Sequence, residues 1–117
     1  MFNLLEEIFN EIGYGDLYFR QGSFGEDAEI PPKYFAFWNN GSILDSHYDN
    51  NNHSSVWTWT IYFYSNDPKL IYSELDKFLE KAKSKGFVIS DEGYDIPSDL
   101  PNYFGRMTRI EYIKLLP

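Results

Sequence analysis

The chain has 117 residues, of which 20% are aromatic, and its formal net charge is −8. A length of this order is typical of one domain. The excess of acids argues against sequence-specific DNA binding, which needs a positive field.

The chain contains no cysteine, which excludes a disulfide framework and a thiolate metal site. Its N-terminus is interrupted by acids and has no basic region of a secretory signal. No apolar run approaches the ~18 residues that a membrane span needs. We therefore expect a soluble chain, made in a reducing cytosol, with no membrane partner.

The N-terminal segment predicts one helix and one short strand. Apolar residues recur at helical spacing over Met1–Ile12, and Gly13 and Gly15 end the pattern. Leu17–Phe19 is a candidate for a short edge strand, and a polar glycine-containing loop follows it.

A second strand is expected over Tyr34–Trp38, directly after the extended Pro31-Pro32 pair. Its bulky residues occupy both parities, so we expect both of its faces to be covered. Asn39–Ser42 is a strong turn signal. The polar stretch Gly41–Ser55 then predicts a long surface loop.

The clearest strand is Trp57–Tyr64, because its residue types alternate cleanly. One face is fully apolar, and we assign it to a core against a helix. The other face is amphipathic and suits a neighbouring subunit or half-wet solvent. The apolar face holds Trp57, Trp59, Ile61 and Phe63, and the amphipathic face holds Thr58, Thr60, Tyr62 and Tyr64.

The clearest helix follows at once. Asp67 is the expected N-cap and Pro68 the first helical residue. Apolar residues recur at helical spacing from Ile71 to Ala82. Gly86 is expected to end the helix in the left-handed conformation, with Phe87 supplying the hydrophobic contact.

The remaining sequence predicts a short strand over Phe87–Ser90, an acidic loop over Asp91–Pro101 and a final strand over Tyr103–Leu116, bent at Gly105. The complete order indicates the α+β class, with a mixed or antiparallel β-sheet and two helices packed on one face. We expect residues 1–117 to form a single domain.

The polar residues do not predict catalysis. His47, Asp49 and His53 share one loop, but the spacing of the two histidines is not that of known metal sites. The acidic pairs Glu26/Asp27, Asp91/Glu92 and Asp95/Asp99 have no nucleophile or phosphate loop beside them. We therefore expect no enzyme activity, no metal and no cofactor. The many aromatic residues instead indicate either self-association or a thick, tyrosine-rich core.

The order of these elements resembles one known family. An aromatic strand preceded by prolines (Pro31–Phe37) is followed by an Asp-Asn step (Tyr48-Asp49-Asn50) and by the strand segment Thr60–Ser65. A helix rich in leucine and lysine (Pro68–Lys85) and a Gly-Phe strand entry (Gly86-Phe87) complete the pattern. In this order the pieces are similar to the tail terminator, or tail completion, proteins of long-tailed bacteriophages and prophages.

The resemblance implies a structural role in the virion. Such proteins form a ring, usually hexameric, that caps the tail tube and joins it to the head. The implied partners are further copies of the chain, the tail tube protein and a head-completion or connector protein, with DNA passing non-specifically through the lumen. The implied location is the tail–head junction, after assembly in the host bacterial cytoplasm.

Two sets of residues are candidates for such a ring. The candidates for subunit interfaces are Thr58, Thr60, Tyr62, Tyr64, Tyr48, Asp49 and Asn50. The candidates for the lumen are Asp91, Glu92, Asp95 and Asp99, because like charge repels phosphate. The alternative hypothesis is a small acidic binding or immunity-type protein that neutralises a basic partner through electrostatic steering.

Overall fold

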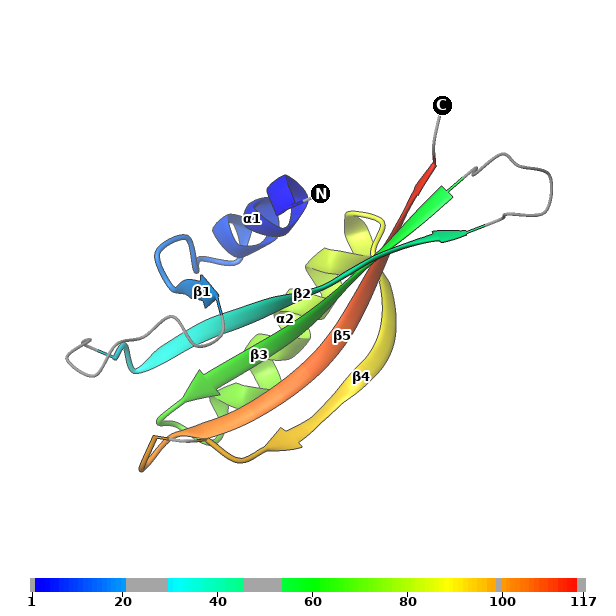
Figure 1. Cartoon of the computed structure of the whole chain (residues 1–117). Coiled ribbons are helices and arrows are strands. Elements are labelled where there is room, and N and C mark those ends of the chain that lie inside the picture. Colours follow the sequence, from blue (N-terminus) through cyan, green and yellow to red (C-terminus); the bar gives the residue numbers. More distant parts are fainter. Residues whose placement is uncertain (1, 21–29, 46–53, 99, 116–117) are drawn as a thin grey trace.

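The computed structural model describes residues 2–20, 30–45, 54–98 and 100–115, which form one α+β domain (Figure 1). The elements are α1 (Phe2–Glu11), β1 (Tyr18–Arg20), β2 (Lys33–Asp45), β3 (Ser54–Ser65), α2 (Leu70–Ser84), β4 (Val88–Ile96) and β5 (Phe104–Leu115). The expected fold class is thus confirmed.

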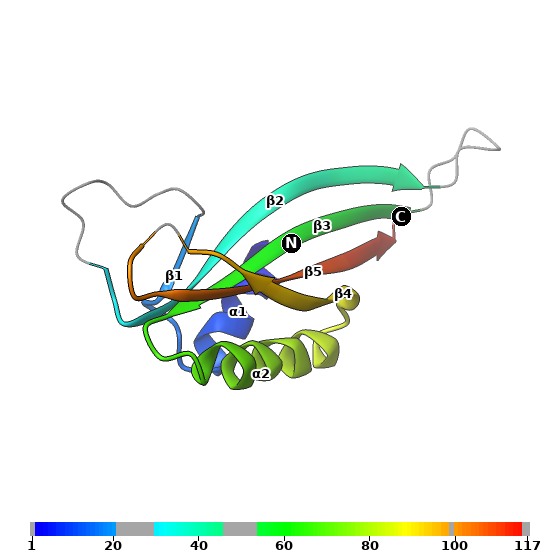
Figure 2. The same ribbon diagram turned by 90° about the horizontal axis from the view of Figure 1, so that it is seen from below.

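The five strands form one mixed sheet in the order β1-β2-β3-β5-β4. β1 runs parallel to β2, and the other neighbouring pairs are antiparallel. Both helices lie on the same face of the sheet, as Figure 2 shows. We call the opposite face the open face.

The main core lies between the helices and the sheet and consists largely of aromatic rings. Phe9 of α1 contacts Phe78 of α2 at 5.3 Å and Phe35 of β2 at 5.2 Å, measured between ring centroids. Phe35 in turn contacts Phe63 of β3 at 4.8 Å. All four side chains are fully buried. Each such ring removes roughly 150–250 Å² from water, so the core accounts for much of the aromatic content.

A smaller cluster covers part of the open face. Tyr34, Ala36 and Tyr64 are buried there, and Phe19 and Tyr103 pack against them. Tyr34 and Tyr64 stack with their centroids 5.3 Å apart. β2 is therefore covered on both faces around Tyr34–Phe37, as its residue pattern predicts.

The end of α2 follows the predicted signal closely. Gly86 has a φ of +95°, and Phe87 donates its backbone N–H to the carbonyl of Ala82 at 3.0 Å. Gly86 donates to Lys83 at 3.1 Å, which completes the two bonds of a Schellman motif.

The start of α2 differs from the expectation, because the helix begins at Leu70 rather than Pro68. The Asp67 carboxylate accepts the Lys69 N–H at 3.0 Å, and Leu70 donates to the Asp67 carbonyl at 3.1 Å. Asp67 therefore makes a cap-type bond, but to a turn that precedes the regular helix.

The turn predicted at Asn39–Ser42 is wrong. These residues lie within β2, where the pairing register with β3 shifts between Asn39 and Ser42. The Asn-Gly pair lies at a β-bulge, a backbone irregularity that resembles a turn in composition. The loop predicted over Gly41–Ser55 is also wrong at both ends, because 41–45 and 54–55 are strand. Residues 46–53 lie outside the described residues.

The acidic loop predicted from Asp91 is likewise wrong over 91–96, which continue β4. Two register shifts interrupt the pairing of β4 with β5, at Ile89/Asp91 and at Asp91/Tyr94. Gly93 lies within the second shift and has a φ of +113°. The polar, glycine-containing sequence thus produces a bulged edge strand rather than a loop.

A buried carboxylate joins three parts of the fold. Glu74 of α2 is only 6% exposed. The Tyr14 hydroxyl donates to its Oε1 at 2.8 Å, and Lys77 pairs with its Oε2 at 2.8 Å. Lys33, at the start of β2, lies 3.8 Å from the carboxylate and 5.2 Å from the centre of the Tyr14 ring. Burial raises the pKa of Glu74, but the hydrogen bonds from Lys77 and Tyr14 outweigh it and hold this pKa below its ordinary value.

We expect Glu74→Ala to lower the free energy of unfolding by about 2 kcal/mol, because it leaves the buried Tyr14 hydroxyl without its acceptor. Glu80→Ala, at an exposed position of the same helix, should change it by no more than about 0.5 kcal/mol. Urea denaturation near neutral pH measures both.

The pH dependence checks the same carboxylate. Because the pKa of Glu74 is lowered in the folded state, its contribution is present above the unfolded value of about 4.3 and is lost as the pH falls through the folded pKa. The difference between wild type and Glu74→Ala should therefore shrink in acid. Equal losses for the two variants at neutral pH would contradict the assignment.

Candidate functional site

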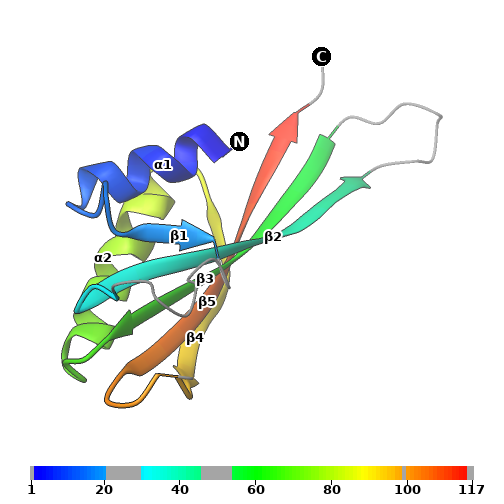
Figure 3. The same cartoon turned by 60° about the vertical axis from the view of Figure 1, so that its left-hand side comes forward.

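One end of the sheet extends beyond the helical layer. Figures 1 and 3 show the far ends of β2, β3 and β5 running past both helices. We call this end the arm and define it as Ser42–Asp45, Ser54–Trp57 and Tyr112–Leu115, which pair side by side. The radius of gyration is 15.5 Å, against about 13 Å for a globular domain of ~100 residues, in keeping with a projecting element.

Apolar side chains are exposed on the open face, close to the arm. Trp38 of β2, at the base of the arm, is 49% exposed, and Ile113 of β5, within the arm, is also 49% exposed. The pairing register places both on the face away from the helices, because Trp38 pairs with Thr60 and Ile113 with Val56. Val88 and Tyr94 of β4 add further exposed apolar surface on this face.

The predicted division of β3 into two faces is confirmed. Trp59, Ile61 and Phe63 lie in the core beneath the helices, whereas Trp57 is half-buried. The four amphipathic residues Thr58, Thr60, Tyr62 and Tyr64 all fall on the open face by alternation.

These four interface candidates differ in how much surface they offer. Tyr64 is only 8% exposed, covered within the chain by the tyrosine cluster. Thr60 is also buried, and its hydroxyl donates to the Asn40 side chain at 2.7 Å. Thr58 and Tyr62 are half-buried and keep accessible surface. The remaining interface candidates, Tyr48, Asp49 and Asn50, lie outside the described residues.

Of the four lumen candidates, the two whose side chains the structure describes, Asp91 and Asp95, lie on opposite faces of the sheet. In the β4–β5 register, Asp91 lies opposite Arg109 on the open face. The Asp91 carboxylate accepts the N–H of Gly93 at 3.0 Å. Asp95 lies opposite Arg106 in the same register, on the face of the sheet that carries the helices. The side chain of Glu92, and Asp99 as a whole, lie outside what the structure describes.

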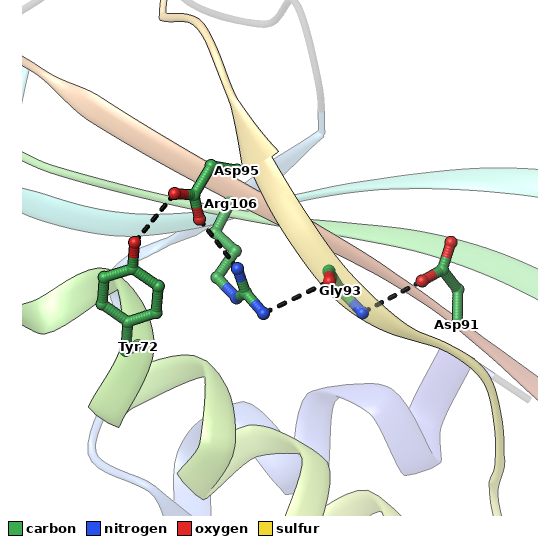
Figure 4. A network of polar contacts seen from close by, with 5 residues as sticks. All are labelled: Tyr72, Asp91, Gly93, Asp95 and Arg106. Carbon is green, nitrogen blue, oxygen red and sulfur yellow. Dashed lines mark hydrogen bonds and ion pairs between the residues drawn. The ribbon is translucent and has the colours of Figure 1, made fainter.

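Asp95 belongs to a polar network that ties the β4–β5 hairpin to α2 (Figure 4). The Tyr72 hydroxyl donates to Asp95 at 2.8 Å, and Arg106 pairs with the other carboxylate oxygen at 2.7 Å. Arg106 also donates to the carbonyl of Gly93 at 3.2 Å and lies over the Tyr72 ring. The bond from Tyr72, followed by that from Arg106, lowers the pKa of Asp95.

Within the described residues, no group of three or more His, Cys, Asp and Glu residues could hold a metal ion. His47, His53 and the pair Glu26/Asp27 fall in undescribed segments. A shallow hollow of about 560 Å³ lies where Glu11 and Ile12 meet α2, but its α2 lining consists of solvated polar side chains.

Trp38 and Ile113 are the residues that sequence reasoning missed. Trp38 was placed in a strand expected to be covered on both faces, yet the neighbouring cover stops at Ala36 and Phe37. Alternation along the strand puts Trp38 on the same face as Tyr34 and Ala36, which is the open face. This alternation was the signal in the sequence that could have identified Trp38. The length of β2, and hence the arm, could not be read from the Asn-Gly signal.

Neither a scan against protein-family models nor a search of curated proteins finds a match for this chain. Within the part of the chain that the structure describes, no helix is both long and apolar enough to cross a membrane. The case for a function therefore rests on the sheet, its arm and its open face.

We expect Tyr72→Phe to raise the pKa of Asp95 toward its ordinary value of about 3.9, because the strongest bond to the ionised carboxylate is lost. Tyr94→Phe is the matched control, since Tyr94 precedes Asp95 but lies on the opposite face of β4. Carboxyl carbon NMR titration measures the shift. An unchanged Asp95 pKa in Tyr72→Phe, or an equal rise in both variants, would contradict the network.

Proposed function

We propose that this chain is a structural subunit that assembles into a closed ring, of the kind that caps a phage tail tube and joins it to the head, without catalysis. The observation that carries the proposal is the projecting arm, with Trp38 and Ile113 half exposed at its base and on its face. The resemblance to tail terminator proteins supplies the biological setting.

Exposed apolar surface of this kind favours a protein partner. Scattered single apolar residues are normal on a protein surface, but aromatic residues grouped on one face are typical of interfaces. Trp38 is a large ring of the type that dominates binding energies, and half-buried Tyr62 lies on the same face. The open face therefore offers an interface beside the candidates Thr58 and Tyr62.

A ring fits this surface better than an isolated pair. The surface around the arm is built from the ends of three different strands and is not symmetric, so one copy can present one part of it to a different part of it on the next copy. Such head-to-tail contacts generate rings when the rotation closes. With a net charge of −8 per chain, a ring of these subunits repels the phosphates of DNA passing through it.

We expect native mass spectrometry to find a closed oligomer, a fixed multiple of 13.8 kDa, either for the chain alone or after addition of purified tail tubes. Trp38→Ser should weaken each contact between subunits roughly thirtyfold, which corresponds to the ~2 kcal/mol of an interface hot spot. Phe104→Ser is the control, because Phe104 is 43% exposed at the opposite end of β5 from the arm.

A strict monomer at all concentrations, with and without tail tubes, would contradict the proposal. The acidic binding or immunity-type function would then take its place, and its test is capture of a basic partner protein. If Trp38→Ser and Phe104→Ser lose assembly equally, the ring would remain supported, but its interface would not be centred on the arm.

A further inference from the structure

The arm has two open edges at the same level of the sheet. Among the described residues, β1 pairs with β2 only at Phe35–Phe37, so the edge of β2 over Ser42–Asp45 has no strand beside it. On the other side, the pairing of β4 with β5 stops at Glu111, which leaves Tyr112–Leu115 without a described partner strand. Both edges flank Ser54–Trp57 of β3.

The backbone groups at the β2 edge can be assigned by alternation. Phe35 donates its N–H to Leu17, away from β3, so Phe35 and Phe63 form a pair that is not hydrogen-bonded. Trp57 has the same parity as Phe63 within β3 and pairs with Ser42. The backbone groups of Ser42, and of Leu44 two residues on, therefore point away from β3, out of the sheet edge.

The same argument places the groups at the β5 edge. β3 pairs with β5 without a register shift, and Trp57, which turns away from β2, pairs with Tyr112. Tyr112 thus bonds toward β3, and the N–H and carbonyl of its neighbour Ile113 point outward. Each edge of the arm consequently presents donors and acceptors to whatever lies next to it.

The outer strands of the sheet body are different. Among the described residues, β1 spans the three residues Tyr18–Arg20, of which Arg20 is exposed. β4 is interrupted by two register shifts and by Gly93 at positive φ. Short length, charge and bulges are the features by which proteins prevent pairing at sheet edges. Within Ser42–Asp45 and Tyr112–Leu115, by contrast, no register shift interrupts the pairing with β3, so another strand can add at these edges.

We infer that neighbouring copies join by backbone pairing between the β5 edge of one arm, Tyr112–Leu115, and the β2 edge of the next, Ser42–Asp45. The inference rests on the proposed ring and specifies its joint. The occupant is a second copy because, among the described residues, the two edges lie at the same level and present outward-pointing backbone groups on opposite sides of one element.

Strand direction fixes the form of this joint. β2 and β5 both run antiparallel to β3, so they are parallel to each other within one chain. In a ring, every copy has the same orientation relative to the axis, and the β5 edge of one copy therefore meets the β2 edge of the next in parallel. The arms then form one continuous sheet around the ring, and closure removes both open edges. Ile113 lies on the edge strand that this pairing covers.

The first test replaces Ile113, because its N–H points outward and its side chain is half exposed. Proline is tolerated at an edge position whose N–H does not bond within the sheet, so Ile113→Pro should fold. By native mass spectrometry it should remain a 13.8 kDa monomer under conditions in which wild type and Ile113→Val form the ring. Near-UV circular dichroism matching wild type checks that the fold is intact.

The second test uses the other edge, with Leu44→Pro and its control Leu44→Val. Each proline variant should be monomeric alone, since each has lost one half of the joint. An equimolar mixture should form a heterodimer and go no further, because only the β5 edge of Leu44→Pro and the β2 edge of Ile113→Pro can still pair. This result would distinguish a head-to-tail joint from a symmetric one.

Three results would overturn the inference. Rings formed by folded Ile113→Pro or Leu44→Pro would show that the joint lies elsewhere, while the proposed function stands. Homodimers of one proline variant would indicate a symmetric edge contact. A wild-type chain that never forms a ring, with or without tail tubes, would remove the proposed function and the joint together.

Discussion

The pairing of β3 with both of its neighbours is the constraint on which the rest of the structure depends. β3 pairs with β5 along its whole length and with β2 along all but the bulge. Its alternation therefore sets the faces of three strands at once. The row containing Trp59, Ile61 and Phe63 requires apolar cover, and α1 and α2 supply it. The opposite row leaves a face that is only partly covered.

The aromatic content of the chain is divided between these two faces. Most of the phenylalanines pack in the core beneath the helices, where close ring contacts such as Phe35–Phe63 remove the largest areas from water. The tyrosines Tyr34 and Tyr64 form the smaller cluster, with hydroxyl-bearing rings near the surface. Trp38 remains outside both clusters. The composition alone predicted an aromatic surplus, but only the fold separates the rings that stabilise the chain from those available to a partner.

Sequence patterns predicted what local chemistry determines and failed where distant pairing decides. Gly86 ends α2 because only its own turn is involved, and the two faces of β3 follow from alternation. The Asn39–Ser42 and Asp91–Ile96 segments have the composition of turns, yet each is held in a strand by its pairing with another strand. In the same way, Tyr64 stacks on Tyr34, which in turn contacts Phe19 and Tyr103, and no local pattern links these residues. The open face was therefore predictable, whereas the arm and its exposed residues were not.

The two ends of the sheet are stabilised differently, and this difference supports the proposed assembly role. At one end, the Glu74 and Asp95 networks join strands to α2, and the helices cover the core. At the other end, the arm consists of the paired ends of β2, β3 and β5 and has no helix over it, a combination that gains little stability by itself. Strands added on both sides would satisfy its open backbone groups and cover Ile113. In the proposed ring, a stable body carries an arm that its neighbours complete, and this pairing would stabilise strands that extend so far from the core.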